Sequence, residues 1–255
     1  MGPSMVVVGA VDGGGGDAAV AAARIGVDVR LVGAVGADAG GLLDGLRREG
    51  VTVDDVVVTE SGHLEAPHVR AVVNGVAELG AVLVTCEVPA AAIAAGVGTA
   101  TGLRVPVVLD PAPVVHTVVG LFDLHPVLTP NAGELTELLR LGGGERAAAP
   151  ASTAAGAATL HSWTGAPVVV TLGAEGALLA AEGRVRRLPA HDAPVRDATG
   201  AGHTLTGVLT AGLAAGQEVE DALVVATVAA GLTAAAPGGR DAMPTGDALA
   251  AALDE

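Results

Sequence analysis

The chain has 255 residues, and 51% of them are hydrophobic, which is enough to bury the core of one α/β domain. Its 28 acidic and 13 basic residues give a formal charge of −15, and such a surface repels the phosphates of nucleic acids and anionic membranes. With one Phe, one Trp and no Tyr there is little to stack on bases. We therefore expect a small-molecule substrate, no nucleic-acid partner and no membrane partner.

Cysteine usage and the N-terminal residues indicate a cytoplasmic protein. Cys86 is the only cysteine, so no disulfide can form within the chain, and we expect a buried structural thiol. The apolar run Met5–Val8 is too short for a signal segment or a membrane span.

Along the chain, short β-branched runs alternate with Ala- and Leu-rich stretches, a pattern typical of a parallel sheet buried on both faces. The expected strands are Met5–Val8, Val29–Val32, Val82–Thr85, Val107–Leu109, Val127–Leu128 and Val168–Leu172. The expected helices are Asp17–Arg24, Leu42–Arg48, Pro89–Ala94, Ala132–Leu141, Ala151–Trp163, Ala201–Ala215, Val219–Ala235 and Thr245–Leu253. The pattern predicts an α/β fold, a three-layer α/β/α arrangement with a mainly parallel sheet, in a single domain over residues 1–255. Gly142 to Pro150 is expected to be a mobile surface loop.

The segment Asp197–His203 is predicted to bind an anion. Gly200 and Gly202 flank the small Ala201, so nothing bulky shields the backbone amides. The apolar spacing after them predicts a helix over Ala201–Ala215, and the N–H groups that open a helix have no partner within it. These amides and the positive end of the helix dipole favour a phosphate or a developing oxyanion above the turn.

The same segment, Asp-Ala-Thr-Gly-Ala-Gly-His, resembles the C-terminal signature Asp-(Thr/Ala)-x-Gly-Ala-Gly-Asp of the ribokinase-like (PfkB) carbohydrate kinases. In that family the glycine-rich amides form the anion hole for the transferred phosphoryl group, and the closing Asp is the general base. The resemblance implies that Gly200, Ala201 and Gly202 form the anion hole here. His203 stands where the family has its catalytic Asp.

Other segments resemble motifs of the same family in the same order, over nearly the whole chain. They are Gly13–Gly26, Val32–Gly41, Asp110–Pro113, Thr129–Glu134 and Thr171–Gly176. A dinucleotide-binding Rossmann site is the competing interpretation, but the first glycine turn does not supply Gly-x-Gly-x-x-Gly in the right phase.

The resemblance also implies roles for individual residues around a bound ATP and Mg²⁺. Asn131 and Glu134 would place phosphate and magnesium, with Glu134 acting on the metal indirectly. The expected nucleotide-side residues are Asn131, Glu134, Thr171, Gly173, Gly176, Asp197 and Thr199. The expected acceptor-side residues are Asp12, Gly14, Gly15 and Asp17. For Asp17 an alternative stays open, because an Asp before a helix can simply cap its N-terminus.

The lid that covers the sugar in many relatives is expected to be reduced or absent. Only Ala10–Asp12 separates the first strand from the glycine turn, and Val69–Leu79, with the turn signal Asn74-Gly75, leaves room for at most one short hairpin. An open site is compatible with a larger acceptor, with a lid lent by another subunit in a homodimer, or with loss of catalysis.

The family resemblance therefore implies an ATP-dependent phosphotransferase that acts on a hydroxyl of a small sugar-like or nucleoside-like molecule. His203 leaves two alternatives. One is a catalytically impaired pseudokinase that binds nucleotide or sugar. The other is a scaffold recruited for a different reaction, with His203 as acid or base and Gly200–Gly202 stabilising an oxyanion.

Overall fold

The central strands are buried on both faces, as their unbroken runs of Val and Leu require. The computed structural model describes residues 2–60, 62–144 and 150–254. In β1 (Ser4–Val8), Met5 and Val7 face one hydrophobic core, and Val6 and Val8 face another. Because side chains alternate between the faces of a strand, one run of apolar residues builds two cores.

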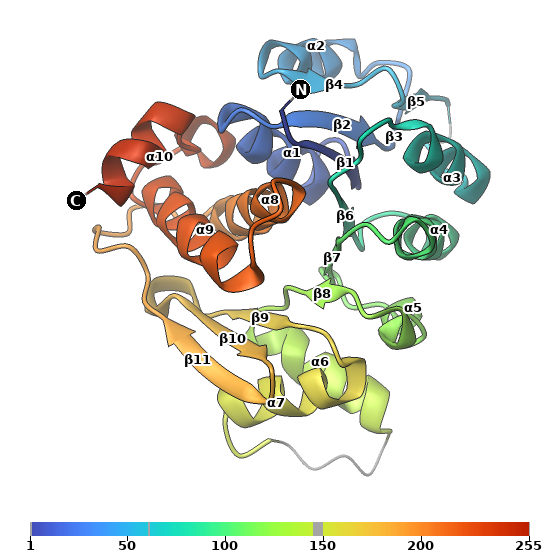
Figure 1. Ribbon diagram of the computed structural model, residues 1–255. Helices are drawn as coiled ribbons and strands as arrows, with labels where there is room; N and C mark the ends of the chain where they lie inside the picture. Colours follow the sequence, from blue (N-terminus) through green and yellow to red (C-terminus); the bar gives the residue numbers. More distant parts are fainter. Residues whose placement is uncertain (1, 61, 145–149, 255) are drawn as a thin grey trace.

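The main sheet has the strand order β11-β10-β9-β8-β7-β6-β1-β2-β4 (Figure 1). Neighbouring strands from β9 to β4 are parallel, and β10 is antiparallel to both β9 and β11. The bounds are β2 (Asp28–Val32), β4 (Val51–Thr52), β6 (Ala81–Thr85), β7 (Val107–Asp110), β8 (Val127–Leu128), β9 (Val168–Thr171), β10 (Ala177–Ala181) and β11 (Arg184–Leu188). The parallel strands end at one common edge of the sheet, which places their C-terminal residues side by side.

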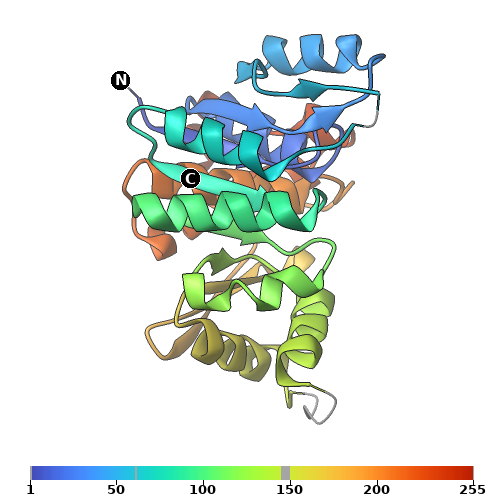
Figure 2. The same cartoon turned by 90° about the vertical axis from the view of Figure 1, so that its right-hand side faces the viewer.

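Helices cover both faces of this sheet, so the fold is a three-layer α/β/α arrangement (Figures 1 and 2). One core contains residues of α1 (Gly14–Arg24), α2 (Gly40–Arg48), α8 (Ala201–Ala214), α9 (Val219–Ala234) and α10 (Gly246–Leu253). The other contains residues of α3 (Ala66–Gly75), α4 (Ala90–Leu103), α5 (His116–Val119), α6 (Ala132–Gly143) and α7 (Thr153–Thr164). Single 3₁₀ turns lie at η1 (Phe122–Leu124), η2 (Gly173–Glu175) and η3 (Gly239–Ala242).

The α/β fold class predicted from the sequence is confirmed, and each expected strand and helix is present, most of them with shifted ends. The largest shift is in α4, which continues to Leu103 rather than ending at Ala94. The antiparallel pair β10–β11 was not expected, because its Ala- and Leu-rich first strand carries no β-branched residue. It closes through Glu182 and Gly183, both at positive φ, a geometry that matches the twist of a two-residue hairpin.

Val69–Leu79, where the sequence left room for at most one short hairpin, contains no hairpin. This region begins inside α3, which has Pro67 in its first turn and buries Val69, Val72 and Val73 at helical spacing. Asn74-Gly75, interpreted as a hairpin turn, is instead the end of that helix. Of the loop expected from Gly142 to Pro150, residues 145–149 lie outside the described residues, and α6 includes Gly142 and Gly143.

A second, small sheet lies beside α3, where β3 (Ala34–Val35) pairs in parallel with β5 (Val57–Val58). Both strands are two residues long, and the Val58 side chain is half exposed. The reduced lid expected from the sequence stays a prediction. The small sheet formed by β3 and β5 lies between the two segments on which that expectation rests.

Candidate functional site

Polar side chains gather where the parallel strands end. Asp110 closes β7, Thr129 follows β8, and Thr171 closes β9. With Asn131, Glu134, Gly202 and His203 they line a cavity of about 120 Å³. The carboxyl edge of a parallel sheet is where ligands of α/β proteins bind, so this cavity is the candidate site.

Asn131 and Glu134 hold each other at the start of α6. The Asn131 side chain accepts hydrogen bonds from the amides of Gly133 and Glu134, at 2.8 and 2.9 Å. The Glu134 carboxylate accepts from the Asn131 amide at 2.8 Å and from its side-chain Nδ2 at 2.7 Å. This capping box fixes both side chains at the cavity wall, with Glu134 presenting negative charge there.

The loop that precedes α8 turns through Gly200, whose φ of +79° is a left-handed conformation that glycine adopts without strain. The Asp197 carboxylate accepts hydrogen bonds from the amides of Thr199, at 3.0 Å, and Gly238, at 3.3 Å. Hydrogen bonds from Thr199 and Gly238 lower the pKa of Asp197. Asp197 thus ties this loop to the segment after α9, and Gly202 and His203 in the first turn of α8 line the cavity.

Helices α1 and α8 approach each other unusually closely next to the cavity. A Cβ on Gly207 would lie 2.4 Å from the carbonyl oxygen of Ala18, so only glycine fits there. Gly207 is one turn after His203, and Ala18 follows Asp17. The close packing of the two helices therefore brings Asp17 and His203 together across 186 positions of sequence.

Asp17 lies between His203 and Arg240. Its Oδ2 is 3.2 Å from Nδ1 of His203, and its Oδ1 accepts from Nε and Nη2 of Arg240, each at 2.7 Å. Burial raises the pKa of Asp17, but the hydrogen bonds from His203 and Arg240 outweigh that effect, and the net pKa is lowered. The carboxylate therefore stays ionised.

The other nitrogen of His203 points at the glycine turn of α1. A Cβ built on Gly14 would lie 2.8 Å from Nε2 of His203 and 3.0 Å from a carboxylate oxygen of Glu87. The hydrogen bond to Asp17 raises the pKa of His203, burial opposes that rise, and the charges of Asp110 and Glu87 add to it. His203 thus lies between the loop before α8 and the N-terminus of α1.

Two buried polar groups form part of the cavity wall. Asp110 is 7% exposed; burial raises its pKa to about 7, the charge of His203 opposes the rise, and that of Glu134 adds to it. Its Oδ1 accepts from the Ala112 amide at 3.2 Å. The hydroxyl of Thr129, a residue 4% exposed, has no hydrogen-bond partner among the described residues. A buried hydroxyl without a partner is costly, so this wall suits a polar ligand or ordered water.

A second cavity, of about 90 Å³, lies on the far side of the loop before α8 and is mainly apolar. Its lining comes from η2, the segment after β11, α8 and α9, and includes Gly173, Gly176, His191, Ala201 and Leu205. Gly176 cannot carry a side chain, because it has a φ of +86° and a Cβ there would lie 2.1 Å from the carbonyl oxygen of Leu188. The two cavities share the N-terminus of α8 as a common wall.

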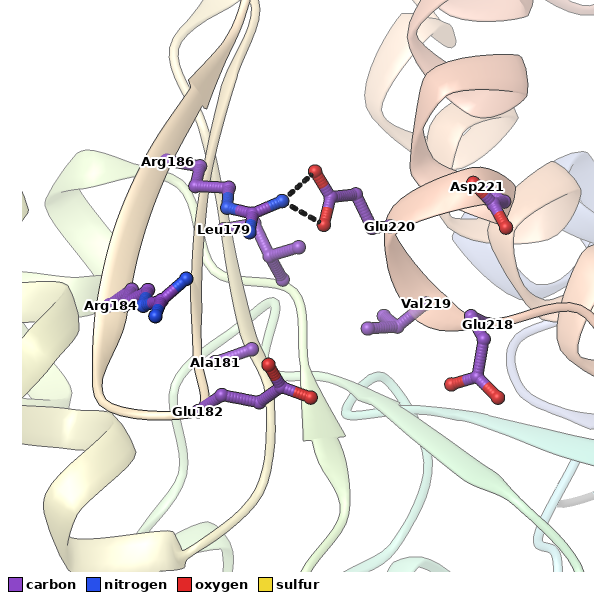
Figure 3. Close-up of a pocket in the computed structure, with 9 residues that line it drawn as sticks. All are labelled: Leu179, Ala181, Glu182, Arg184, Arg186, Glu218, Val219, Glu220 and Asp221. Atoms are coloured by element: carbon purple, nitrogen blue, oxygen red, sulfur yellow. Dashed lines mark hydrogen bonds and ion pairs between the residues drawn. The ribbon is translucent and has the colours of Figure 1, made fainter.

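A third concavity, shown in Figure 3, lies between the β10–β11 hairpin and the start of α9. Arg186 of the hairpin is ion-paired with both carboxylate oxygens of Glu220 across it. Its lining shares no residue with the two cavities beside α8. It is therefore separate from the candidate site.

The structure brings most of the expected site residues together. Asn131, Glu134, Thr171, Gly202 and His203 line the polar cavity, and Gly173, Gly176 and Ala201 line the apolar one. The remaining expected residues are Gly200, Asp197 and Thr199 in the loop before α8, Gly14, Gly15 and Asp17 in the first turns of α1, and Asp12 just before that helix.

One alternative on the expected acceptor side, that Asp17 caps its helix, is wrong. Asp17 is not the N-cap of its helix, because α1 begins at Gly14 with Gly13 as the cap, and the Asp17 carboxylate is engaged by His203 and Arg240. Asp12 is exposed ahead of the helix, whereas Gly15 packs so closely on Gly9 that a Cβ would lie 2.7 Å from the Gly9 Cα.

Sequence reasoning missed Glu87, Asp110, Thr129 and Arg240 as site residues. The first three had a signal, since each lies just after or at the end of an expected strand. Arg240 had none, because it lies in an irregular segment far from the motifs. Cys86 is buried, as expected, and burial raises the pKa of its thiol to about 12.

Two further properties concern the described part of the chain. None of its helices combines the length and the apolar character needed to cross a membrane. It also has no group of three or more His, Cys, Asp or Glu side chains placed to hold a metal ion.

Comparison with known proteins gives one family. Residues 73–246 match the family described as pfkB family carbohydrate kinase. Among curated proteins, the ribokinase of Bacillus subtilis (strain 168) is 30% identical over 259 aligned residues, which cover 91% of this chain and 84% of that protein.

Solved structures agree with this family. The crystal structure of ribokinase from Cryptococcus neoformans var. grubii serotype A, in complex with ADP, has 26% identity and a TM-score of 0.81, covering 97% of this chain and 99% of that chain. The ribokinase of Arabidopsis thaliana, complexed with ribose and ATP, shares the fold with a TM-score of 0.80 and 22% identity over 100% of both chains.

Proposed function

Because the chain belongs to the pfkB family of carbohydrate kinases, we propose that it transfers the γ-phosphoryl group of ATP to a hydroxyl of a small sugar-like or nucleoside-like molecule. The observation that carries this proposal is the position of His203. Its imidazole lies at the N-terminus of α8, between the amides of the Gly200–Gly202 loop and the Gly14 turn. A base beside an anion-binding loop is the arrangement that phosphoryl transfer to a hydroxyl requires.

In the proposed reaction the acceptor hydroxyl oxygen attacks the γ-phosphorus. A new oxygen–phosphorus bond forms, the bond from the γ-phosphorus to the bridging oxygen breaks, and ADP leaves with that electron pair. The hydroxyl proton passes to Nε2 of neutral His203. The amides of Gly200–Gly202 and the N-terminus of α8 stabilise the negative charge on the transferred group.

The nucleotide is proposed to bind across the N-terminus of α8. The apolar cavity next to Gly173 and Gly176 suits an aromatic base, and Ala201 lies where the triphosphate would pass toward the polar cavity. The related Cryptococcus ribokinase was crystallised in complex with ADP, which supports a nucleotide as the donor.

The polar cavity suits a hydrated Mg²⁺ carried with the nucleotide. Its wall offers oxygen donors, the type of ligand that magnesium prefers, and the hydroxyl of Thr129 has no partner among the described residues. Both carboxylate oxygens of Glu134 already accept hydrogen bonds from Asn131, so Glu134 would hold the ion through water. Magnesium would neutralise phosphate charge during transfer.

The test is phosphoryl transfer from ATP and Mg²⁺ to D-ribose and to a panel of hexoses and nucleosides, with ADP release and the mass of the product as readouts. Formation of a product heavier than the acceptor by one phosphoryl group supports the proposal. Turnover with none of these acceptors contradicts it.

A nucleotide-binding protein without kinase activity is the second candidate, favoured by the imidazole at the place of the family's carboxylate base. Thermal denaturation separates the two candidates. ATP with Mg²⁺ should stabilise a nucleotide-binding fold by about 2.7 kcal/mol at a hundred times its Kd, or roughly 5–10 °C in Tm. Stabilisation without turnover supports the second candidate, and no stabilisation at millimolar nucleotide contradicts both.

A further inference from the structure

We propose that Asp17 and Arg240 are positioning residues for His203. The Asp17 carboxylate, held by Arg240, fixes the imidazole as the Nδ1–H tautomer and leaves Nε2 free to accept a proton above the Gly14 turn. The role given to Nε2 rests on the proposed kinase function. The tautomer and the two contacts of Asp17 do not depend on it.

The division of the two carboxylate oxygens is the first step of the argument. Oδ1 of Asp17 accepts a hydrogen bond from Nε of Arg240 and is also ion-paired with Nη2, each at 2.7 Å. Oδ2 is therefore left to pair with Nδ1 of His203, at 3.2 Å. An ionised carboxylate can only accept hydrogen bonds. Nδ1 must therefore carry the proton, and in neutral His203 the lone pair is on Nε2.

Arg240 is itself held in place, which makes it a fixed partner rather than a mobile surface cation. Nη1 of Arg24 donates to the backbone carbonyls of Arg240, at 3.1 Å, and Met243, at 2.7 Å. Arg24 is in turn ion-paired with Glu49 at 2.8 Å. The segment η3 is thus attached to the end of α1, and Asp17 lies near the start of the same helix.

The charges that face His203 come from several elements. Asp17 on α1 and Asp110 at the end of β7 raise its pKa, as does Glu87 after β6, while burial lowers it. Arg240 on η3 faces Asp17 and offsets part of that carboxylate's negative charge. Removing the charge of Asp17 should therefore lower the pKa of His203, and removing Arg240 should raise it.

These opposite signs separate positioning by charge from a merely structural role. A structural defect at either residue would loosen the same contact and shift the pKa of His203 in one direction for both variants. In Asp17→Asn the oxygen of the new side-chain amide should keep the contacts with the two N–H groups of Arg240. The nitrogen of that amide then faces His203 and donates a hydrogen bond to Nδ1. That reverses the tautomer and moves the proton onto Nε2.

The tautomer is measured directly by long-range ¹H–¹⁵N NMR of the histidine rings in the full-length protein, with His203→Gln used only to assign the His203 signals. In the wild-type protein we expect the Nδ1–H tautomer above the pKa of His203. We expect the Nε2–H tautomer and a lower pKa in Asp17→Asn, and a higher pKa in Arg240→Met. A wild-type Nε2–H tautomer, or pKa shifts of the same sign in both variants, overturns the proposal.

Arg24→Met is the matched control for Arg240→Met, because Arg24 holds the same segment without touching Asp17. We expect it to lower Tm and leave the tautomer and pKa of His203 unchanged. A rise in the pKa of His203 equal to that in Arg240→Met would mean that segment placement, not charge, sets the pKa, and would contradict the role of Arg240. If Asp17→Asn does not fold, the proposal is still tested by the wild-type tautomer of His203 and by the change in its pKa in Arg240→Met.

Kinetics extend the test to catalysis, with whichever acceptor the wild-type protein phosphorylates. Asp17→Asn should lower kcat by about 10²- to 10⁴-fold and leave KM for ATP within about threefold, because only the base is mispositioned. The acidic limb of kcat/KM should move to lower pH in Asp17→Asn and to higher pH in Arg240→Met. A kcat unchanged in Asp17→Asn overturns the positioning role. A wild-type protein without turnover but with the expected tautomer and shifts instead contradicts the proposed function alone.

Discussion

The proposed nucleotide side and the proposed acceptor side of the candidate site differ in what presents their functional groups. On the nucleotide side the loop before α8 and the turn at Gly173–Gly176 present backbone to the cavities, with Gly200, Gly173 and Gly176 at positive φ. On the proposed acceptor side the groups are side chains, namely His203, Asp17 and Arg240.

This difference matters because backbone geometry and side-chain chemistry tolerate change differently. Amides at a helix N-terminus bind an anion whatever side chain follows, as long as the turn keeps its conformation. A base works only with the right tautomer, charge and position. We therefore expect substitutions on the acceptor side to change turnover and spare nucleotide binding, and the following predictions test that division.

The largest effect is expected from His203→Ala. Loss of the base should lower phosphoryl transfer by about 10²- to 10⁴-fold, or roughly 3–5.5 kcal/mol of barrier. The apparent Kd for ATP with Mg²⁺, obtained from thermal stabilisation, should stay within a few-fold of the wild-type value, because the amides of Gly200–Gly202 remain. His116→Ala is the control, because His116 is exposed and outside the site. Equal turnover in His203→Ala and the wild-type protein would exclude a catalytic role for His203.

The next effect concerns Asp110, which lines the polar cavity. Its pKa is raised to about 7 by burial, whereas an unfolded Asp ionises near 4. Protonated Asp110 is thus favoured in the folded state. The stability that this protonated group contributes is fully present below about pH 4 and is lost as pH rises toward 7. Asp110→Asn removes this loss. Its free energy of unfolding relative to the wild-type protein should increase between pH 4 and pH 7, by up to about 4 kcal/mol.

The measurement is denaturant unfolding of both proteins at several pH values, without nucleotide or Mg²⁺. A difference between the two proteins that is flat, or that falls with rising pH, would contradict the raised pKa of Asp110.

A smaller effect is expected from Gly207→Ala, which tests the helix contact beneath the acceptor side. The new Cβ would lie 2.4 Å from the carbonyl oxygen of Ala18 and must push α1 away from α8. Overpacking of this kind costs about 1–3 kcal/mol, or roughly 2–10 °C in Tm, and it should also lower kcat by separating Asp17 from His203.

Gly98→Ala in α4 is the matched control, since a Cβ there has no neighbour within 4 Å. It should leave Tm unchanged or raise it slightly through better helix propensity. Equal Tm changes in Gly207→Ala and Gly98→Ala would show that the α1–α8 contact does not depend on glycine.

The smallest effect is expected on the nucleotide side, from Arg187→Ala. Arg187 forms an ion pair with Glu175 of η2, but both side chains are more than half exposed. Exposed pairs contribute at most about 1 kcal/mol and are screened by salt. The Tm should fall by a few degrees at most, and less at 1 M salt, with the apparent Kd for ATP within twofold. A larger loss of ATP binding would mean that this turn depends on side chains after all.

Secondary structure was predictable wherever local sequence carried a single strong signal. The β-branched run at Val82–Thr85 could only be a buried strand, whereas Ala177–Ala181 has the composition of a helix and is a strand because it pairs with β9 and β11. In α3 two signals competed. The spacing of Val69, Val72 and Val73 is helical, and Asn74-Gly75, which is also a turn signal, is the end of that helix.

The sequence by itself determined the parts of the site whose partners are a few residues apart. Asn131 and Glu134 meet because they are three positions apart at a helix start, and Gly200–Gly202 opens the following helix by its own backbone freedom. Such contacts need only the local geometry of a turn or a helix, so spacing alone reveals them.

Only the tertiary structure decided what surrounds His203. Asp17 is 186 residues from His203 and 223 from Arg240, and the three meet because α1 packs on α8 at Gly207 and because Arg24 anchors the segment that carries Arg240. Burial in the folded protein also raises the pKa of Asp110. A side chain's charge state and tautomer depend on its neighbours in space, and no local pattern in the chain records which neighbours the fold will supply.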